Sequence, residues 1–303
     1  MNTTPSFTHT LRQRWQAADS MLCVGLDPDP ARIPAHLGTG PEAIDRFCRD
    51  IIAATADTVC AFKPQIAYFA AQGAEDVLAG LIAHIHAEHP GIPVILDAKR
   101  GDIGSTARQY GVEAFDRFKA DALTLSPFMG FDSIEPYFEW AGRGLILLCR
   151  TSNPGGNDLQ ALSVLPAGDT AGAPPALHKP ASGTTPDTQP EKLYEHLARL
   201  AAGPWNVSGE LGLVVGATFP DELARVRALA PRLPLLVPGV GAQGGDVNAT
   251  VRTGLDADGY GLVINSSRAI LYAGQGTDFA DQARKAAVAT RDAIRAARDA
   301  ARA

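Results

Sequence analysis

The stretch Ile92-Pro93-Val94-Ile95-Leu96-Asp97-Ala98-Lys99-Arg100-Gly101-Asp102 joins an apolar run to a cluster of charges. The run follows Pro90-Gly91 and is typical of a strand in a parallel sheet whose two faces are both covered. Asp97 and Lys99 are two residues apart, so on a strand their side chains point to the same side. Asp102 follows in the turn. Because charges at the rim of an apolar core are costly to desolvate, this pattern favours a functional role.

Apolar runs of this kind recur along the chain and alternate with amphipathic stretches. Eight such units favour a closed (β/α)8 TIM barrel. A doubly wound open sheet is the alternative, but it usually carries a GxGxxG turn where this chain has Gly25-Leu26-Asp27-Pro28-Asp29. We therefore predict an α/β fold with one TIM-barrel domain over residues 1–303. The predicted strands are Met21–Leu26, Thr58–Phe62, Pro93–Leu96, Ala122–Leu125, Leu145–Cys149, Leu211–Gly216, Leu233–Val237 and Gly261–Ile264.

Helical patterns lie between most of these strands, and several begin with a residue that favours a helix N-terminus. These capping residues are Ser105, Asp132, Asp221 and Asp246. The clearest predicted helices are Ala43–Ala56, Gln72–Glu88, Ser105–Lys119, Asp132–Trp140, Asp221–Leu229 and Asp246–Thr253.

Two segments fall outside the strand–helix repeat. Residues 153–190 are rich in Pro, Gly, Ala and Thr and lack periodicity. They predict a surface insertion after the fifth strand, for which we favour a mobile segment over an ordered lid. Residues 278–303 are rich in Ala, Arg and Asp and predict a terminal helix that packs on its alanines.

Composition and charge restrict the class of protein. The formal net charge is −6 and no basic block is present, which argues against a nucleic-acid partner. The four cysteines are scattered without a CxxC pair, as expected for reduced thiols in the cytoplasm rather than for disulfides or a zinc site. We expect no signal peptide, because the first residues are polar, and no membrane span, because no apolar segment reaches about 18 residues.

Charged residues stand where the first three predicted strands end. Asp27 ends the first strand, Lys63 ends the second, and Asp97 and Lys99 end the third, with Asp102 just beyond. In a TIM barrel the C-terminal strand ends meet at one mouth, where active sites lie. A salt-bridged rim is the alternative for any one of these residues. Five of them on three consecutive strand ends favour a catalytic array.

Two later strand ends indicate a phosphate site. The segment 238–246 after the seventh strand is glycine-rich, so its backbone N–H groups could approach an anion closely, and a helix N-terminus follows. Asn265-Ser266-Ser267-Arg268, after the eighth strand, supplies hydroxyls and a guanidinium. A turn that needs glycine only for its geometry is the alternative. Barrels often hold phosphate at these two loops, which favours phosphate binding.

On these residues the chain resembles the orotidine 5′-phosphate decarboxylase family, in its longer-chain bacterial subgroup, type 2. Asp97-Ala98-Lys99-Arg100-Gly101-Asp102-Ile103-Gly104-Ser105-Thr106 closely matches the signature of that subgroup. Shorter matches extend the resemblance over nearly the whole chain. These are Gly25-Leu26-Asp27, Phe62-Lys63-Pro64, Ser126-Pro127-Phe128, residues 238–245 and Ser267-Arg268.

The resemblance implies the activity and the roles of individual residues. The family converts orotidine 5′-phosphate to UMP and carbon dioxide without cofactor or metal, as a homodimer with active sites at the subunit interface. The matching charged network is Lys63, Asp97, Lys99 and Asp102, with Lys99 protonating C6 of the pyrimidine and Asp102 reaching into the neighbouring subunit's site. The matching substrate-binding residues are Asp27 and Thr106 for the ribose, Ser152 and Pro238 for the pyrimidine, and Gln243, Gly244, Gly245 and Arg268 for the phosphate.

Two other functions remain open from the sequence. A related barrel enzyme that acts on a keto-sugar phosphate shares an Asp-x-Lys-x-x-Asp stretch but uses magnesium and an enediolate. Lys63 and Arg100-Gly101 favour the orotidylate enzyme instead. A non-catalytic nucleotide-binding protein is the other possibility, but binding alone does not require a lysine that faces Asp97.

Overall fold

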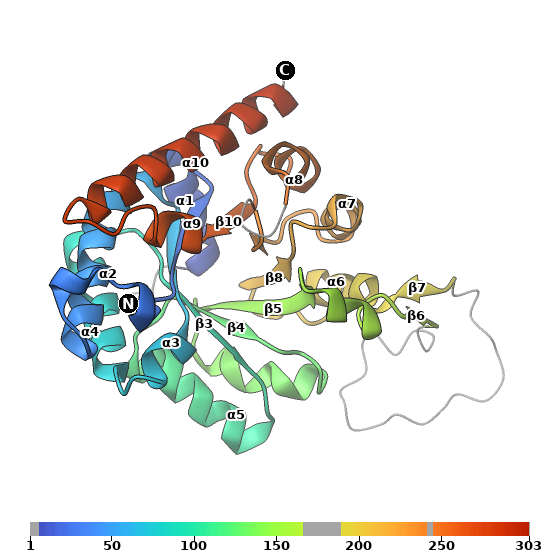
Figure 1. Cartoon of the computed structure of the whole chain (residues 1–303). Helices are drawn as coiled ribbons and strands as arrows, with labels where there is room; N and C mark the ends of the chain where they lie inside the picture. Colours follow the sequence, from blue (N-terminus) through green and yellow to red (C-terminus); the bar gives the residue numbers. More distant parts are fainter. Residues whose placement is uncertain (1–5, 166–188, 241–244, 303) are drawn as a thin grey trace.

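The computed structural model describes residues 6–165, 189–240 and 245–302. Within them, eight parallel strands are hydrogen-bonded in the order β2-β1-β10-β9-β8-β5-β4-β3 (Figure 1). Parallel bridges between Phe62 and Val94 and between Gln65 and Asp97 join β2 to β3 and close the ring. The predicted TIM barrel is therefore confirmed. Its strands are β1 (Leu22–Leu26), β2 (Ala61–Pro64), β3 (Ile95–Arg100), β4 (Ala122–Leu125), β5 (Gly144–Arg150), β8 (Leu211–Val215), β9 (Leu235–Val237) and β10 (Leu262–Ser266).

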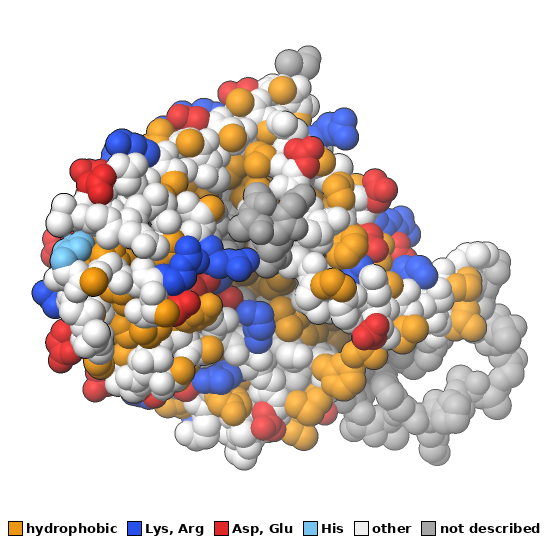
Figure 2. Space-filling view, in the orientation of Figure 1, with side chains coloured by type: hydrophobic (Ala, Val, Ile, Leu, Met, Phe, Trp, Pro, Cys, Tyr) orange, Lys and Arg blue, Asp and Glu red, His pale blue; other side chains and the backbone are white. Residues whose placement is uncertain are grey.

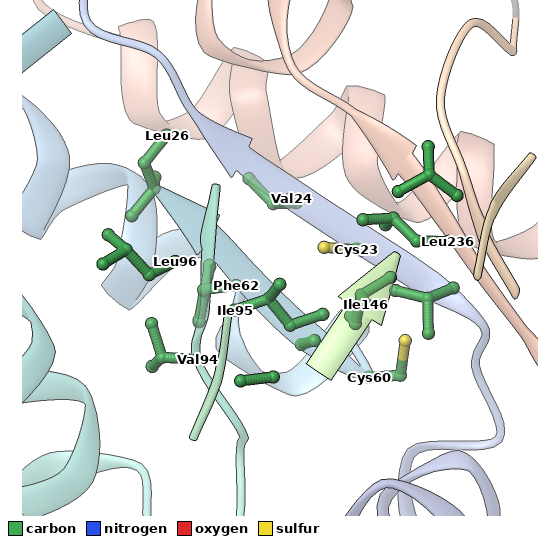
Figure 3. Packing of buried hydrophobic residues seen from close by; sticks show 14 of the residues in the cluster. Cys23, Val24, Leu26, Cys60, Phe62, Val94, Ile95, Leu96, Ile146 and Leu236 are labelled. Carbon is green, nitrogen blue, oxygen red and sulfur yellow. The ribbon is translucent and has the colours of Figure 1, made fainter. Parts of the chain in front are cut away.

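The barrel strands are almost completely buried, as their apolar sequences predict. Figure 3 shows side chains from β1, β3, β5 and β9 together in the space between the strands. The residues labelled there include Cys23, Ile95, Ile146 and Leu236, each at most 3% exposed. This packed interior supports the C-terminal strand ends, where the charged residues lie.

Helices surround the barrel, and α10 packs against α2 and α8 on its outside (Figure 1). The terminal helix is confirmed as α10, which buries Ala283, Ala287 and Ala297 together with Phe279 and Ile294. Four described helices, α1, α3, α6 and α9, lie where we predicted none. The helices are α1 (Phe7–Ala18), α2 (Pro41–Thr55), α3 (Ile66–Ala70), α4 (Glu75–Glu88), α5 (Gly104–Gly111), α6 (Leu193–Ala202), α7 (Pro220–Leu229), α8 (Val247–Gly254), α9 (Arg268–Leu271) and α10 (Phe279–Arg302).

The predicted helix over Asp132–Trp140 is wrong. The chain forms two short 3-10 turns there, Phe131–Ser133 and Glu135–Glu139. Pro136 explains the break, because proline lacks an N–H and its ring clashes with the carbonyl four residues earlier in an α-helix.

Helix capping was predicted correctly at one of the three α-helices concerned. The Asp246 carboxylate accepts hydrogen bonds from the backbone N–H groups of Asn248 and Ala249 and so caps α8. Ser105 lies inside α5, and Asp221 lies inside α7 behind Pro220. Proline favours the first helical position because its fixed φ suits the helix, which moves the start of α7 one residue earlier.

The described part of the insertion contains more structure than we predicted. It begins with a 3-10 turn, Pro154–Asp158, and includes strand β6 (Ser163–Val164), which pairs antiparallel with β7 (Glu191–Lys192) beside α6 (Figure 1). Residues 166–188 lie outside the described part of the chain. Among the helices described, none has the length and apolar character to cross a membrane.

Candidate active site

Asp97 holds two lysines at the mouth of the barrel. Its carboxylate lies 2.8 Å from Lys63 Nζ through Oδ2 and 2.6 Å from Lys99 Nζ through Oδ1. The hydroxyl of Thr124 on β4 also donates to Oδ1, at 3.0 Å. The three strand ends β2, β3 and β4 therefore supply one hydrogen-bonded group, in which Lys63, Asp97 and Lys99 meet as the sequence predicts.

The two lysines differ in their exposure to solvent. The side chain of Lys63 is 5% exposed, whereas that of Lys99 is 47% exposed. Burial alone would lower the pKa of Lys63, but the charges of Asp97 and Asp27 outweigh burial and raise it. Burial likewise opposes ionisation of Asp97, yet Lys63 and Lys99 hold its pKa well below the usual range. Lys63 and Asp97 are therefore both charged at neutral pH, and the second lysine, Lys99, is open to solvent.

Strand β3 becomes irregular where these charges begin. Leu96 pairs with Leu123, but Arg100 pairs with Leu125, so four steps along β3 match two steps along β4. The backbone N–H groups of Ala98 and Lys99 both donate to Thr124 Oγ1 at 3.0 Å. Alternation along a regular strand is thus not the reason that Asp97 and Lys99 meet.

The same segment contains two residues with left-handed backbone conformations. Lys99 has φ +48° and Asp102 has φ +75°. Residues other than glycine rarely adopt such values, and they cluster at functional sites where the surroundings hold them in place. This conformation at Lys99 accompanies the side-chain geometry that brings its ammonium to Asp97.

A cavity of about 180 Å³ opens beside the charged group. Asp27, Lys63 and Asp97 line one part of it, while Pro238 and Arg268 line another. Two buried side-chain atoms there, Oδ1 of Asp27 and Oδ1 of Asn265, have no hydrogen-bond partner among the described residues. Figure 2 shows Lys and Arg side chains with acidic ones between them near the middle of the visible face. Unpaired buried acceptors of this kind suit a ligand that brings hydroxyl or N–H donors.

The predicted phosphate residues are only partly described. The side chain of Arg268 is exposed at the start of α9 and forms no ion pair with any residue of the described ranges. Gly245 packs closely, because an added Cβ would lie 2.8 Å from the carbonyl oxygen of Gly239, and its N–H donates to that oxygen at 3.2 Å. Gln243 and Gly244 lie outside the described residues.

Ser152 lies on the loop after β5, next to the end of β8. Its carbonyl oxygen accepts a hydrogen bond from the Thr218 hydroxyl at 3.3 Å. A Cβ on Gly216 would stand 2.7 Å from both the backbone nitrogen and the Cα of Ser152. Glycine at position 216 therefore allows the two backbones to approach closely and fixes the place of Ser152.

Asp102 and Thr106 do not line the cavity of their own barrel. The carboxylate of Asp102 accepts from the next backbone N–H, that of Ile103, at 2.8 Å. Thr106 is exposed in the first turn of α5. Within one chain, Asp27, Lys63, Asp97, Pro238 and Arg268 line the cavity, and Lys99 joins them through its contact with Asp97. Asp102 and Thr106 lie outside this group.

Sequence reasoning missed Thr124 and the hydroxyl of Tyr272. Thr124 is the one hydroxyl residue in the apolar run Ala122–Leu125, and it is buried in the structure. A polar residue within an otherwise apolar strand was the sequence signal that could have revealed it. Tyr272 holds the loop after β1 through contacts between residues that are 243 and 245 positions apart. No local pattern reveals a contact at that separation.

Comparisons with known proteins show the family of this chain. The profile described as "Orotidine 5'-phosphate decarboxylase / HUMPS family" matches residues 20–173. A protein named orotidine 5'-phosphate decarboxylase from Azoarcus sp. (strain BH72) is 63% identical over 95% of this chain and 98% of its own length. The protein of the same name from Aromatoleum aromaticum is 62% identical with the same coverage.

Solved structures match over the same extent. Leishmania donovani OMP decarboxylase is 40% identical with a TM-score of 0.77, covering 97% of this chain and 99% of that one. Leishmania donovani UMP synthase is 41% identical with a TM-score of 0.76, covering 96% of this chain and 57% of that one. With a profile that spans half of its residues and relatives that match along nearly all of it, this chain belongs to the orotidine 5′-phosphate decarboxylase / HUMPS family.

Proposed function

We propose that this cavity converts orotidine 5′-phosphate to UMP and carbon dioxide, a step of pyrimidine biosynthesis. The observation that carries the proposal is Asp97 held between a buried and an exposed lysine in a cavity that Arg268 also lines. Relatives that are 56% to 63% identical are all named orotidine 5'-phosphate decarboxylase, which favours this substrate over a keto-sugar phosphate.

Lys99 is the proton donor in the proposed mechanism. When the bond between C6 and the carboxylate breaks, its electron pair stays on C6 and carbon dioxide leaves. The pyrimidine offers no enolate or cofactor that could delocalise this charge, so a nearby ammonium stabilises it and then donates a proton to C6. Lys99 fits this role because its side chain is 47% exposed, whereas Lys63 is 5% exposed.

Asp97 and Lys63 prepare the site for this step. Asp97 binds Lys99 at 2.6 Å and so fixes the position of the ammonium. We assign Asp97 a second role, in which it faces the substrate carboxylate and the repulsion between them ends when carbon dioxide leaves. Lys63 keeps Asp97 ionised at a position where burial would otherwise favour the neutral acid.

The remaining predicted residues bind the parts of the nucleotide that do not react. Asp27 accepts hydrogen bonds from the ribose, and its buried, unpaired Oδ1 supports this role. Ser152 and Pro238 contact the pyrimidine. Arg268, Gln243, Gly244 and Gly245 hold the phosphate, for which the exposed guanidinium of Arg268 is suited. Binding energy from the phosphate can then order the site around the reacting ring.

The active form in this proposal is a homodimer in which Asp102 and Thr106 complete the partner's site. Four exposed apolar side chains support it, one on α3, which follows β2, and three on the loops after β3 and β4. They are Tyr68, Ile103, Phe128 and Met129, exposed by 38%, 48%, 78% and 51%. Exposed apolar side chains in one region indicate a surface that another molecule covers. Ile103 follows Asp102 directly in the chain. An interface that covers Ile103 would therefore place Asp102 close to the partner subunit.

The proposal extends to the setting of the enzyme. We propose one domain over residues 1–303, no metal or cofactor, and a cytoplasmic location, for which the four buried free cysteines are a supporting observation.

One assay tests the function. The pyrimidine absorbance of orotidine 5′-phosphate is followed with purified protein, with and without a metal chelator. We expect decarboxylation at the same rate in both samples. Turnover that the chelator abolishes, or turnover of a keto-sugar phosphate instead, would favour the magnesium-dependent relatives. Nucleotide binding without any turnover would favour a non-catalytic protein.

A further inference from the structure

The loop after β1 is held by a residue from the opposite end of the chain. The hydroxyl of Tyr272 donates to the carbonyl oxygen of Asp27 at 2.8 Å and accepts from the N–H of Asp29 at 2.7 Å. Both hydrogen-bonding functions of the hydroxyl are therefore used on one turn. Burial raises the pKa of Tyr272 to about 12, so the hydroxyl keeps its proton and can donate.

The ring of Tyr272 is itself fixed by its neighbours. The guanidinium of Arg32 lies 3.9 Å from the ring centroid, and the ring of Phe47 stacks on Tyr272 with 6.0 Å between centroids. Cation–π contact and stacking each restrict the ring. The hydroxyl is thus a fixed point and not a mobile surface group.

Tyr272 also belongs to the segment that carries the phosphate-binding arginine. It follows α9 directly, and its N–H donates to the carbonyl oxygen of Arg268 at 3.3 Å. Arg268 and Asp27 line the same cavity. The short segment from Arg268 to Tyr272 therefore carries the guanidinium at its first residue. Its last residue is hydrogen-bonded to the backbone of Asp27.

We propose that Tyr272 is a positioning residue that sets the ribose-binding Asp27 relative to the phosphate-binding Arg268. This inference rests on the proposed function and adds a link between two parts of its site. The Oδ1 atom of Asp27 has no hydrogen-bond partner among the described residues that could fix the carboxylate. We therefore infer that the hydrogen bond from Tyr272 to the backbone carbonyl of Asp27 orients this side chain. Loss of the hydrogen bond between Tyr272 and Asp27 weakens recognition of the ribose and leaves the guanidinium of Arg268 in place.

The test uses Tyr272→Phe, which removes only the hydroxyl and keeps the stacked ring. Dissociation constants are measured by calorimetry for UMP, for its 2′-deoxy and 3′-deoxy analogues, and for inorganic phosphate. We expect the preference for UMP over at least one deoxy analogue to fall by about three- to tenfold, as for a misplaced hydrogen bond to a carboxylate. We expect binding of inorganic phosphate to stay unchanged.

Tyr260→Phe is the matched control. The hydroxyl of Tyr260 accepts from Arg298 at 3.3 Å, and Tyr260 does not line the cavity. We expect this variant to keep the wild-type preference. Melting temperatures of both variants report any general loss of stability.

A double-mutant cycle with Asp27→Ala separates positioning from a structural role. If Tyr272 acts through Asp27, adding Tyr272→Phe to Asp27→Ala leaves the preference between UMP and the deoxy analogues unchanged. Additive losses, or equal weakening of nucleotides and inorganic phosphate, would overturn the inference. Turnover by the wild-type protein is established first, so an unchanged preference in Tyr272→Phe refutes this link alone and not the proposed function.

Discussion

At the scale of single residues, two lysines bind one carboxylate but differ in their exposure to solvent. Lys63 lines the cavity but is buried, and Asp97 and Asp27 raise its pKa, so it does not release its proton easily. Lys99 is half exposed and binds the other oxygen of the same carboxylate. The residue pattern alone did not reveal this difference in exposure, because both are lysines at strand ends, and only the family resemblance distinguished them.

Replacing Lys99 by alanine should abolish turnover. We expect kcat to fall by at least about 10⁴-fold, because one group both stabilises the charge at C6 and supplies the proton. UMP binding should change little, since the ribose and phosphate contacts remain. Steady-state kinetics and calorimetry measure the two effects. Lys285→Ala, an exposed lysine on α10, is the control and should behave as wild type. Near-normal turnover in Lys99→Ala would remove Lys99 from the mechanism.

At the scale of elements, the sequence was sufficient for the eight strands and for most helices. Strands and helices were predictable because the spacing of apolar residues along the chain reflects which side of each element faces the core. The bulge in β3 was not predictable, because it depends on Thr124 of the neighbouring strand taking up two backbone N–H groups. The break in the helix predicted over Asp132–Trp140 was predictable, in contrast, because Pro136 is present in the sequence and proline interrupts an α-helix.

The site was predictable to a similar degree. Residues at strand ends were brought together as expected, because a barrel places all of these ends at one mouth. Contacts made by loops were not predictable from the sequence, and the hydrogen bonds between Tyr272 and the turn after β1 are an example.

The contact between β8 and the loop after β5 leads to a prediction about Gly216. Replacing Gly216 by alanine puts a Cβ 2.7 Å from the backbone of Ser152, which must then move. We expect kcat/KM to fall by about 10- to 100-fold, because displacements near 1 Å have large effects in active sites. Stability should fall by about 1–3 kcal/mol from the overpacking. Kinetics and urea unfolding measure the two quantities.

Gly80→Ala provides the matched comparison for this variant. Gly80 lies inside α4, where an added Cβ would come no closer than 3.8 Å to the side chain of Arg49. Alanine should stabilise that helix by about 0.5–1 kcal/mol and leave kinetics unchanged. If Gly216→Ala behaved in the same way, the close approach to Ser152 would have no functional importance.

At the scale of the whole molecule, Asp102 and Thr106 lie outside the cavity of their own barrel, and in the proposed dimer they complete the partner's site. The exposed apolar side chains near them, including Ile103 and Phe128, belong to the same loop face. A twofold dimer through this face would let each chain give these residues to the other.

Mixed dimers test this sharing. Lys99→Ala and Asp102→Ala proteins should each be inactive alone. In a mixed dimer, one site loses both residues and the other keeps both, so one working site returns. Random exchange should therefore restore about a quarter of the wild-type activity. The measurement is turnover after the two proteins are unfolded and refolded together. A mixture as inactive as its parents would refute the shared site.

The left-handed conformations of Lys99 and Asp102 have a consequence for the evolution of the chain. Glycine would adopt these backbone angles without strain, whereas a residue with a Cβ gives up about 1–2 kcal/mol at such a position. Selection for heat resistance alone would favour the backbone of glycine at these positions, whereas the proposed chemistry requires the charged side chains. If the proposed roles hold, thermostability and activity make opposite demands on the same two residues.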